Sequence, residues 1–122
     1  MPSPAIAVLL PASERSAVTD HLRDGGFTPI AVADAAELSA PLATRNDIAV
    51  AVLDLDERPD EGTEAWAMLR AQGRDIPGLL VLADSALERF VQHGAGRPED
   101  EFVTRPYSAE SLRWRVEAMC IR

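Results

Sequence analysis

Apolar positions along the chain follow two different spacings. Short, nearly continuous apolar runs are typical of strands buried on both faces of a sheet. Segments with apolar residues three or four positions apart are typical of helices that bury one side. The runs predict five strands, over residues 5–10, 28–32, 48–53, 79–83 and 102–104. The spaced segments predict five helices, over residues 13–24, 34–44, 62–71, 87–93 and 108–120.

Polar residues and glycines mark where several of these helices begin and end. Ser13, Asp34 and Ser108 stand at the expected starts, and their side-chain oxygens can accept hydrogen bonds from free backbone N–H groups. The pair at residues 25–26 is Gly-Gly, which is typical of a helix end. Gly62 is expected to open the third helix.

Strands that alternate with helices predict a parallel sheet with helices on both faces. The predicted fold class is therefore α/β, a three-layer α/β/α sandwich. A chain of 122 residues has the size of a single domain. In such sheets, functional side chains gather at the carboxyl ends of the strands.

Composition and charge narrow the function classes. A net charge of −8 repels nucleic-acid phosphates and anionic lipid, so neither is expected as a direct partner. No apolar run approaches the roughly 20 residues of a membrane span, and no secretion signal precedes the first strand. The single cysteine, Cys120, permits no internal disulfide. A cytoplasmic location is the expectation.

Motifs for common cofactors are absent from the chain. It has no Gly-x-Gly-x-x-Gly motif and no Walker loop, which argues against nucleotide binding. It also lacks Asp-x-His-x-x-Gly, which argues against corrinoid binding. The sequence therefore predicts no enzyme and no resident cofactor.

Two segments carry candidate chemistry. Asp54 ends the most uniformly apolar run, and Gly62 follows eight residues later. Further on, Phe102-Val-Thr-Arg-Pro-Tyr107 joins the last predicted strand to the last helix. In a parallel sheet, both segments would present polar side chains at the same edge.

These segments, in this order, resemble the phosphoacceptor strand and the last strand of response-regulator receiver domains. The resemblance extends over nearly the whole chain and implies the strand order 2-1-3-4-5. It implies that Asp54 is the phosphoacceptor and that Arg105 stands in place of the family's lysine. It also implies a cis Arg105–Pro106 bond. As a switch residue after the last strand, it points to Tyr107.

Departures from the family pattern decide which function is expected. Pro11 and Ala12 stand where receivers keep the acidic pair that holds a divalent cation. Glu14, Asp56 and Asp54 are the remaining candidate ligands, so at most weak Mg²⁺ binding is predicted. The switch hydroxyl at the end of the fourth strand falls on Leu82 or Ala83, with Ser85 as an imperfect substitute.

The first hypothesis is therefore a degenerate receiver, or pseudo-receiver, which acts by protein contact without efficient phosphorylation. The alternative is a working phosphoacceptor receiver of a phosphorelay, with Asp54 as the acceptor. A third hypothesis is a small-molecule sensor at the vestigial pocket. Without a bound cation, Arg105 is expected to pair with Asp54.

The last helix predicts the contact surface. Leu112, Val116 and Met119 share the stripe that should face the sheet. The opposite stripe and its flanks form a candidate interface, which consists of Trp114, Ala118, Ile121, Arg113 and Arg115. We expect a homodimer or another signalling protein to bind here, with help from the last strand and the acidic segment at residues 94–101. The chain stops after this helix, as receivers do when cut from longer proteins.

Overall fold

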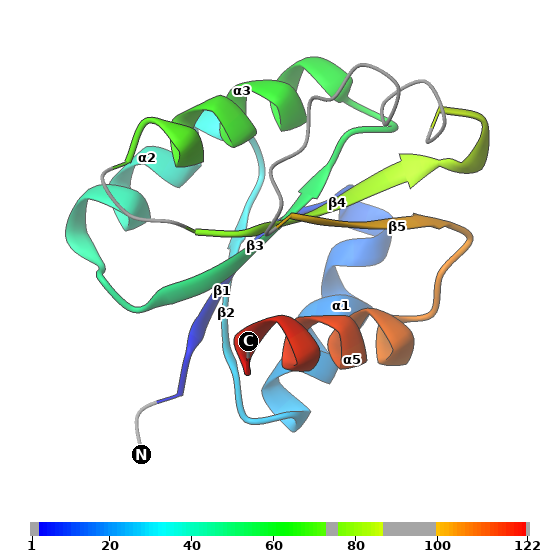
Figure 1. The fold of residues 1–122 in the computed structure, drawn as a ribbon, viewed down its shortest axis with the longest axis horizontal. Helices are drawn as coiled ribbons and strands as arrows, with labels where there is room; N and C mark the ends of the chain where they lie inside the picture. The colour runs from blue at the N-terminus through cyan, green and yellow to red at the C-terminus, as the bar shows by residue number, and fades with distance from the viewer. Residues whose placement is uncertain (1–2, 73–75, 87–99, 122) are drawn as a thin grey trace.

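Five parallel strands form one sheet in the computed structural model, which describes residues 3–72, 76–86 and 100–121 (Figure 1). Their order is β2-β1-β3-β4-β5, which confirms the predicted topology. The strands are β1 (Ala5–Leu9), β2 (Thr28–Val32), β3 (Ile48–Asp54), β4 (Gly78–Ala83) and β5 (Glu101–Arg105). The helices that the structure describes in full are α1 (Ala12–Asp24), α2 (Ala35–Thr44), α3 (Pro59–Arg70) and α5 (Ala109–Cys120).

Helices cover both faces of the sheet, as Figure 1 shows, with α1 and α5 on one side and α2 and α3 on the other. Alternation along β1 explains both layers. Ile6 and Val8 belong to the apolar cluster that contains α1 and α5 residues, whereas Ala7 and Leu9 belong to the opposite cluster. β1 is buried along its whole length, which explains why its sequence is a continuous apolar run.

Helix starts match the sequence at two of the predicted caps. The side chain of Asp34 accepts a hydrogen bond from the backbone N–H of Glu37, at 2.9 Å. The Ser108 hydroxyl accepts one from the N–H of Ser111, at 3.0 Å. After α1, Gly26 has a φ of 89°, a conformation that costs glycine little. The predicted stop of α1 at the glycine pair is confirmed.

Two other predicted starts are wrong. The N-cap of α1 is Pro11, not Ser13, because the chain turns directly into the helix and the Pro11 carbonyl accepts from the Glu14 N–H at 3.0 Å. α3 begins at Pro59 rather than at Gly62. Proline at a first helical position loses no hydrogen bond, so the helix begins there without cost. The predicted helix at 87–93 lies outside the described residues.

Within the ranges given above, no helix combines the length and the apolar character that a membrane crossing requires.

Candidate functional site

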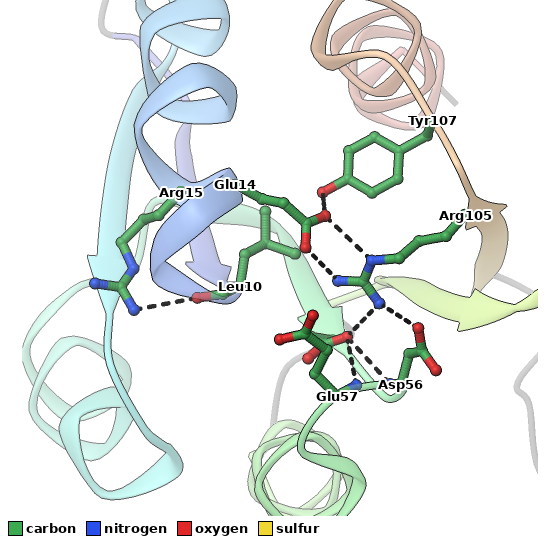
Figure 2. Close-up of polar contacts among 8 residues, drawn as sticks. Leu10, Glu14, Arg15, Asp56, Glu57, Arg105 and Tyr107 are labelled. Carbon is green, nitrogen blue, oxygen red and sulfur yellow. Dashed lines mark hydrogen bonds and ion pairs between the residues drawn. The ribbon is translucent and has the colours of Figure 1, made fainter.

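The candidate site lies at the carboxyl edge of the sheet, where β1, β3 and β5 end (Figure 2). Asp54 is the last residue of β3, and Arg105 is the last residue of β5. Glu14 lies in the first turn of α1, directly after β1. The parallel sheet therefore brings together side chains that are 91 positions apart in the sequence.

The Arg105 guanidinium lies among three carboxylates. Its Nε and Nη2 donate to the two oxygens of Glu14, at 3.2 and 2.8 Å. Its Nη1 donates to Asp54 Oδ1 at 2.9 Å and to Asp56 Oδ2 at 2.8 Å. Charge-assisted bonds in a fork of this kind are both strong and directional. The predicted ion pair between Arg105 and Asp54 is confirmed, and Glu14 and Asp56 join it.

Asp54 is nearly buried, with 3% of its surface exposed. Its Oδ1 also accepts hydrogen bonds from the backbone N–H groups of Asp56 and Glu57, at 3.1 and 3.4 Å. The loop after β3 thus folds back over this oxygen. The carboxylate is held by the loop on one side and by Arg105 on the other.

Tyr107 belongs to the same network. Its hydroxyl donates a short hydrogen bond to Glu14 Oε1, which also receives the Arg105 Nε–H. Burial raises the pKa of Tyr107, and the bond to Glu14 raises it further. Burial by itself would lower the pKa of Arg105, but the bonds to Glu14, Asp54 and Asp56 more than offset this, and the pKa is raised. Both groups therefore keep their protons across the physiological range.

A cavity of ≈ 460 Å³ adjoins the site, lined by Glu14, Glu57, Arg105, Pro106 and Tyr107. The bond between Arg105 and Pro106 is cis, as predicted.

The residues present do not fit a receiver-type magnesium site. Glu14, Asp54 and Asp56 are brought around one point, but the guanidinium fills that point. At the place of the missing acids, the Pro11 carbonyl accepts from the N–H groups of Glu14 and Arg15, both at 3.0 Å. Among the residues in the described ranges, no group of three or more acidic, histidine or cysteine side chains is arranged to hold a metal ion.

Two of the candidate switch residues, Ala83 and Tyr107, lie beside Arg105. Ala83 is paired with Arg105 in the register between β4 and β5, and it carries no hydroxyl. Ser85 follows β4 and is exposed. Tyr107 is bonded inward, as described above. Sequence reasoning missed the Tyr107–Glu14 bond, although the position of Glu14 in the first turn after β1 placed it at this edge.

Gly62 controls how closely α3 approaches the site. A Cβ atom at this position would lie 2.0 Å from the carbonyl oxygen of Asp54 and 2.6 Å from Leu55 Cδ2. The absence of a side chain lets α3 pack directly against the end of β3. Gly62 is therefore a close-approach residue in the fourth position of α3, not the residue that opens the helix.

The predicted stripes on α5 are confirmed in their burial. Leu112, Val116 and Met119 are buried against the sheet, with at most 5% exposure. On the opposite stripe, Trp114 is 55% exposed and Ile121 is 87% exposed.

The remaining residues of the candidate interface differ in their exposure and contacts. Ala118 and Arg115 are exposed. Arg113 turns toward its own domain, pairs with Glu117 at 3.5 Å and lies over Gly25 at the end of α1.

Asp100 is used inside the domain rather than on its surface. It is 8% exposed and accepts hydrogen bonds from Trp66 Nε1 at 3.1 Å and from the Gly78 N–H at 2.8 Å. Asp100 belongs to the acidic segment at residues 94–101 that was expected to help form the contact surface, but its carboxylate instead bonds within the domain. Trp66 is buried, and the Arg70 guanidinium lies over its ring at 5.3 Å. The rest of the predicted acidic segment up to residue 99 falls outside the described residues.

Comparisons with known proteins agree with this fold. No family model matches the chain. Sensory transduction protein RegX3 of Mycolicibacterium smegmatis is 33% identical over 102 residues, which are 83% of this chain and 43% of that protein. The chain thus spans less than half the length of this curated relative.

Two solved structures with similar folds are described as receiver domains. The receiver domain of the Francisella response regulator 1452 has a TM-score of 0.80 and 21% identity, and the match covers 98% of each chain. The receiver domain of the sensor histidine kinase PA1611 from Pseudomonas aeruginosa has a TM-score of 0.79 and 18% identity, over 98% of this chain and 99% of that one. That structure has a magnesium ion coordinated in its active-site cleft. At these identities the likeness establishes the receiver fold of this chain.

Proposed function

We propose that the chain is a receiver module of a two-component signalling system that acts through protein contacts and is not phosphorylated efficiently. The fold and the 33% identity to a sensory transduction protein support the signalling assignment. The main support for inefficient phosphorylation is that Glu14, Asp54 and Asp56 all form ion pairs with Arg105.

Phosphoryl transfer to a carboxylate depends on positioning and on cations that neutralise the charge of the phosphoryl group. Here the acids that remain near Asp54 are already neutralised in part by a side chain of the same domain. Asp54 Oδ1 accepts hydrogen bonds from three donors, and an oxygen bonded in this way is a weak nucleophile. Phosphorylation would require Arg105 to release Asp54 without any gain in metal ligands after β1.

The alternative, a working phosphoacceptor, draws support from the position of Asp54 at the end of β3 and from the adjoining cavity of ≈ 460 Å³. The same cavity is the observation that favours small-molecule sensing. Both alternatives need a ligand to displace or extend the ion-pair network.

Intact-mass measurement after incubation with acetyl phosphate and Mg²⁺ tests the proposal. We expect no stoichiometric phosphoryl adduct on the wild-type chain. Asp20→Asn serves as a matched control, because Asp20 is an exposed carboxylate of α1 that pairs with Arg23. An adduct that persists in Asp20→Asn and disappears in Asp54→Asn establishes the phosphoacceptor alternative instead.

For the contact surface, we propose self-association or binding of another signalling protein through β5 and the outer stripe of α5. The large exposed apolar side chains on this stripe, Trp114 and Ile121, motivate the choice. Truncating a tryptophan anchor commonly costs ~2 kcal/mol or more of binding free energy.

Light scattering over a concentration series tests the homodimer form of this proposal. We expect a concentration-dependent mass for the wild type that falls in Trp114→Ala. Glu64→Ala, an exposed change on α3 in the opposite layer, is the control and should leave the mass unchanged. A wild type that stays monomeric contradicts the homodimer hypothesis. A dimer that persists in Trp114→Ala must have its interface elsewhere on the molecule.

A further inference from the structure

One nitrogen of Arg105 occupies a point that two carboxylates share. Nη1 lies 2.9 Å from Asp54 Oδ1 and 2.8 Å from Asp56 Oδ2. Mg²⁺ in proteins is commonly held by one or two carboxylates and completes its shell with water. The point filled by Nη1 therefore already has the number of protein oxygens that a small divalent cation uses.

We propose that the Arg105 guanidinium is the resident cation of this pocket and that it excludes Mg²⁺ and Mn²⁺ from a site that Asp54 and Asp56 would otherwise form. The proposal gives the side-chain carboxylate of Asp56 a role as a second ligand beside Asp54. It rests on the observation that a metal ion does not fit the wild-type residues. It does not depend on whether Asp54 is phosphorylated.

Little movement separates the present arrangement from a metal site. Mg²⁺–oxygen distances are about 2.0–2.1 Å, so each carboxylate oxygen would move less than about 1 Å toward the vacated point. The Asp56 side chain is 30% exposed and lies in the loop after β3, where it can adjust. Asp54 accepts hydrogen bonds from the N–H groups of Asp56 and Glu57, which orient its carboxylate for either cation and permit a small shift.

Glu14 explains why the guanidinium prevails over a free ion. It binds Nε and Nη2 in a fork and so orients Nη1 toward Asp54 and Asp56. Arginine is weakly hydrated and always charged, whereas Mg²⁺ gives up its water reluctantly. The arginine is also part of the chain, so its effective concentration at the site exceeds that of a dilute ion.

Removing Arg105 would leave an excess of negative charge. Glu14, Asp54 and Asp56 would lose their shared counter-charge, and Glu57 lines the same cavity. Unpaired charges that are partly buried are costly, and a divalent cation is the ligand that relieves them most directly. Arg105→Gln should therefore convert a metal-indifferent pocket into a metal-binding one.

Isothermal titration of chelator-treated protein with MnCl₂, and separately with MgCl₂, tests this inference. We expect no saturable heat for the wild type and one saturable site in Arg105→Gln, so that any wild-type affinity is at least about tenfold weaker than that of the variant. Adding Asp56→Asn to Arg105→Gln should abolish the new site. Arg45→Gln is the matched control, because it removes an arginine from an exposed ion pair with Asp47 and should create no site.

Two results overturn the proposal: wild-type binding as tight as that of Arg105→Gln, or no binding by an Arg105→Gln variant whose circular dichroism is native. If Arg105→Gln does not fold, Arg105→Lys replaces it, because an ammonium keeps the charge but cannot bridge all three carboxylates. Arg105→Lys must then bind Mn²⁺ more tightly than the wild type, and failure to do so counts against the proposal. The first of these results, if it came without a phosphoryl adduct, would overturn this inference and leave the proposed function standing.

Discussion

Removing the charge of Arg105 should destabilise the domain far more than removing the charge of Asp54. Asp54 is buried and Arg105 is partly buried, with exposed side-chain fractions of 4% and 19%, and they form one ion pair. Their surroundings are not symmetric, however. Arg105 faces three carboxylates, whereas Asp54 faces one cation and two acids of its own sign, Glu14 and Asp56.

The magnitudes follow from these contacts. At about 4 Å and an effective dielectric constant of ~20, each attraction of Arg105 is on the order of 4 kcal/mol before hydration is counted. Deleting one partner of a buried ion pair typically costs about 3–5 kcal/mol. Because Glu14 and Asp56 are 25% and 30% exposed, water screens part of their share. We therefore expect Arg105→Gln to lower the free energy of unfolding by about 3 kcal/mol, at the low end of that range.

Asp54→Asn loses one attraction but also relieves two repulsions. Asp54 Oδ1 and Asp56 Oδ2 both contact Nη1. These oxygens are therefore less than about 6 Å apart, and their repulsion is on the order of 3 kcal/mol at the same dielectric constant. An asparagine oxygen can still accept from Arg105 and from the loop N–H groups. The expected change in the free energy of unfolding is within about 1 kcal/mol, because the charge terms nearly cancel.

Urea unfolding followed by tryptophan fluorescence measures both variants on one scale. The midpoint of Arg105→Gln should fall well below that of the wild type, and the midpoint of Asp54→Asn should stay close to it. Equal losses for the two variants would refute the charge argument, because only a simple two-residue pair predicts symmetry. A larger loss for Asp54→Asn would show that the loop bonds to Asp54 matter more than the guanidinium.

Two further predictions concern the neighbours of this network. Tyr107 is the sole tyrosine, so tyrosinate absorbance reports its ionisation directly. Its pKa should lie above the ordinary value of about 10 and fall toward that value in Glu14→Gln. The stability that depends on the neutral phenol should be complete below pH ~10 and decline as the pH rises further. An ordinary midpoint in a natively folded wild type would contradict the Tyr107–Glu14 bond. Gly62→Ala should cost about 2 kcal/mol in urea unfolding despite better helix propensity, because the new Cβ meets the Asp54 carbonyl oxygen at 2.0 Å. Ala67→Gly, on the exposed side of α3, measures the propensity term alone, and a stabilised Gly62→Ala would show that α3 can move away freely.

Much of this arrangement follows from spacing alone. Continuous apolar runs such as residues 48–53 predicted the buried strands, and their alternation with helices predicted a parallel sheet. The meeting of Asp54 and Arg105 could be predicted because parallel strands end at one edge. Two cap residues with a side-chain oxygen, Asp34 and Ser108, were also predicted correctly.

The misses occur where contacts between distant segments decide the structure. α3 begins at Pro59, before the glycine, and Arg58 and Glu61 at its start bond to the backbone at the beginning of α2. Local spacing contains no information about such contacts, so Gly62 looked like a helix start. Asp100 looked like a surface acid in an acidic stretch, yet two donors from α3 and β4 hold it inside. A buried carboxylate is stable when it is hydrogen-bonded, and sequence does not reveal the donors.

The geometry of arginine explains how this site links to the α5 surface. Lysine would present one ammonium and could not reach Glu14 on one side and both Asp54 and Asp56 on the other. Arg105 does so, and it thereby joins α1, β3 and β5 in one network. Glu14 also accepts the Tyr107 hydroxyl bond, so the segment that leads into α5 is attached to α1 both before and after Pro106. The start of the helix that carries Trp114 is therefore held by the same carboxylate that orients Arg105. A partner that binds the outer stripe of α5 would therefore contact a surface whose position is fixed by ion pairs within the domain.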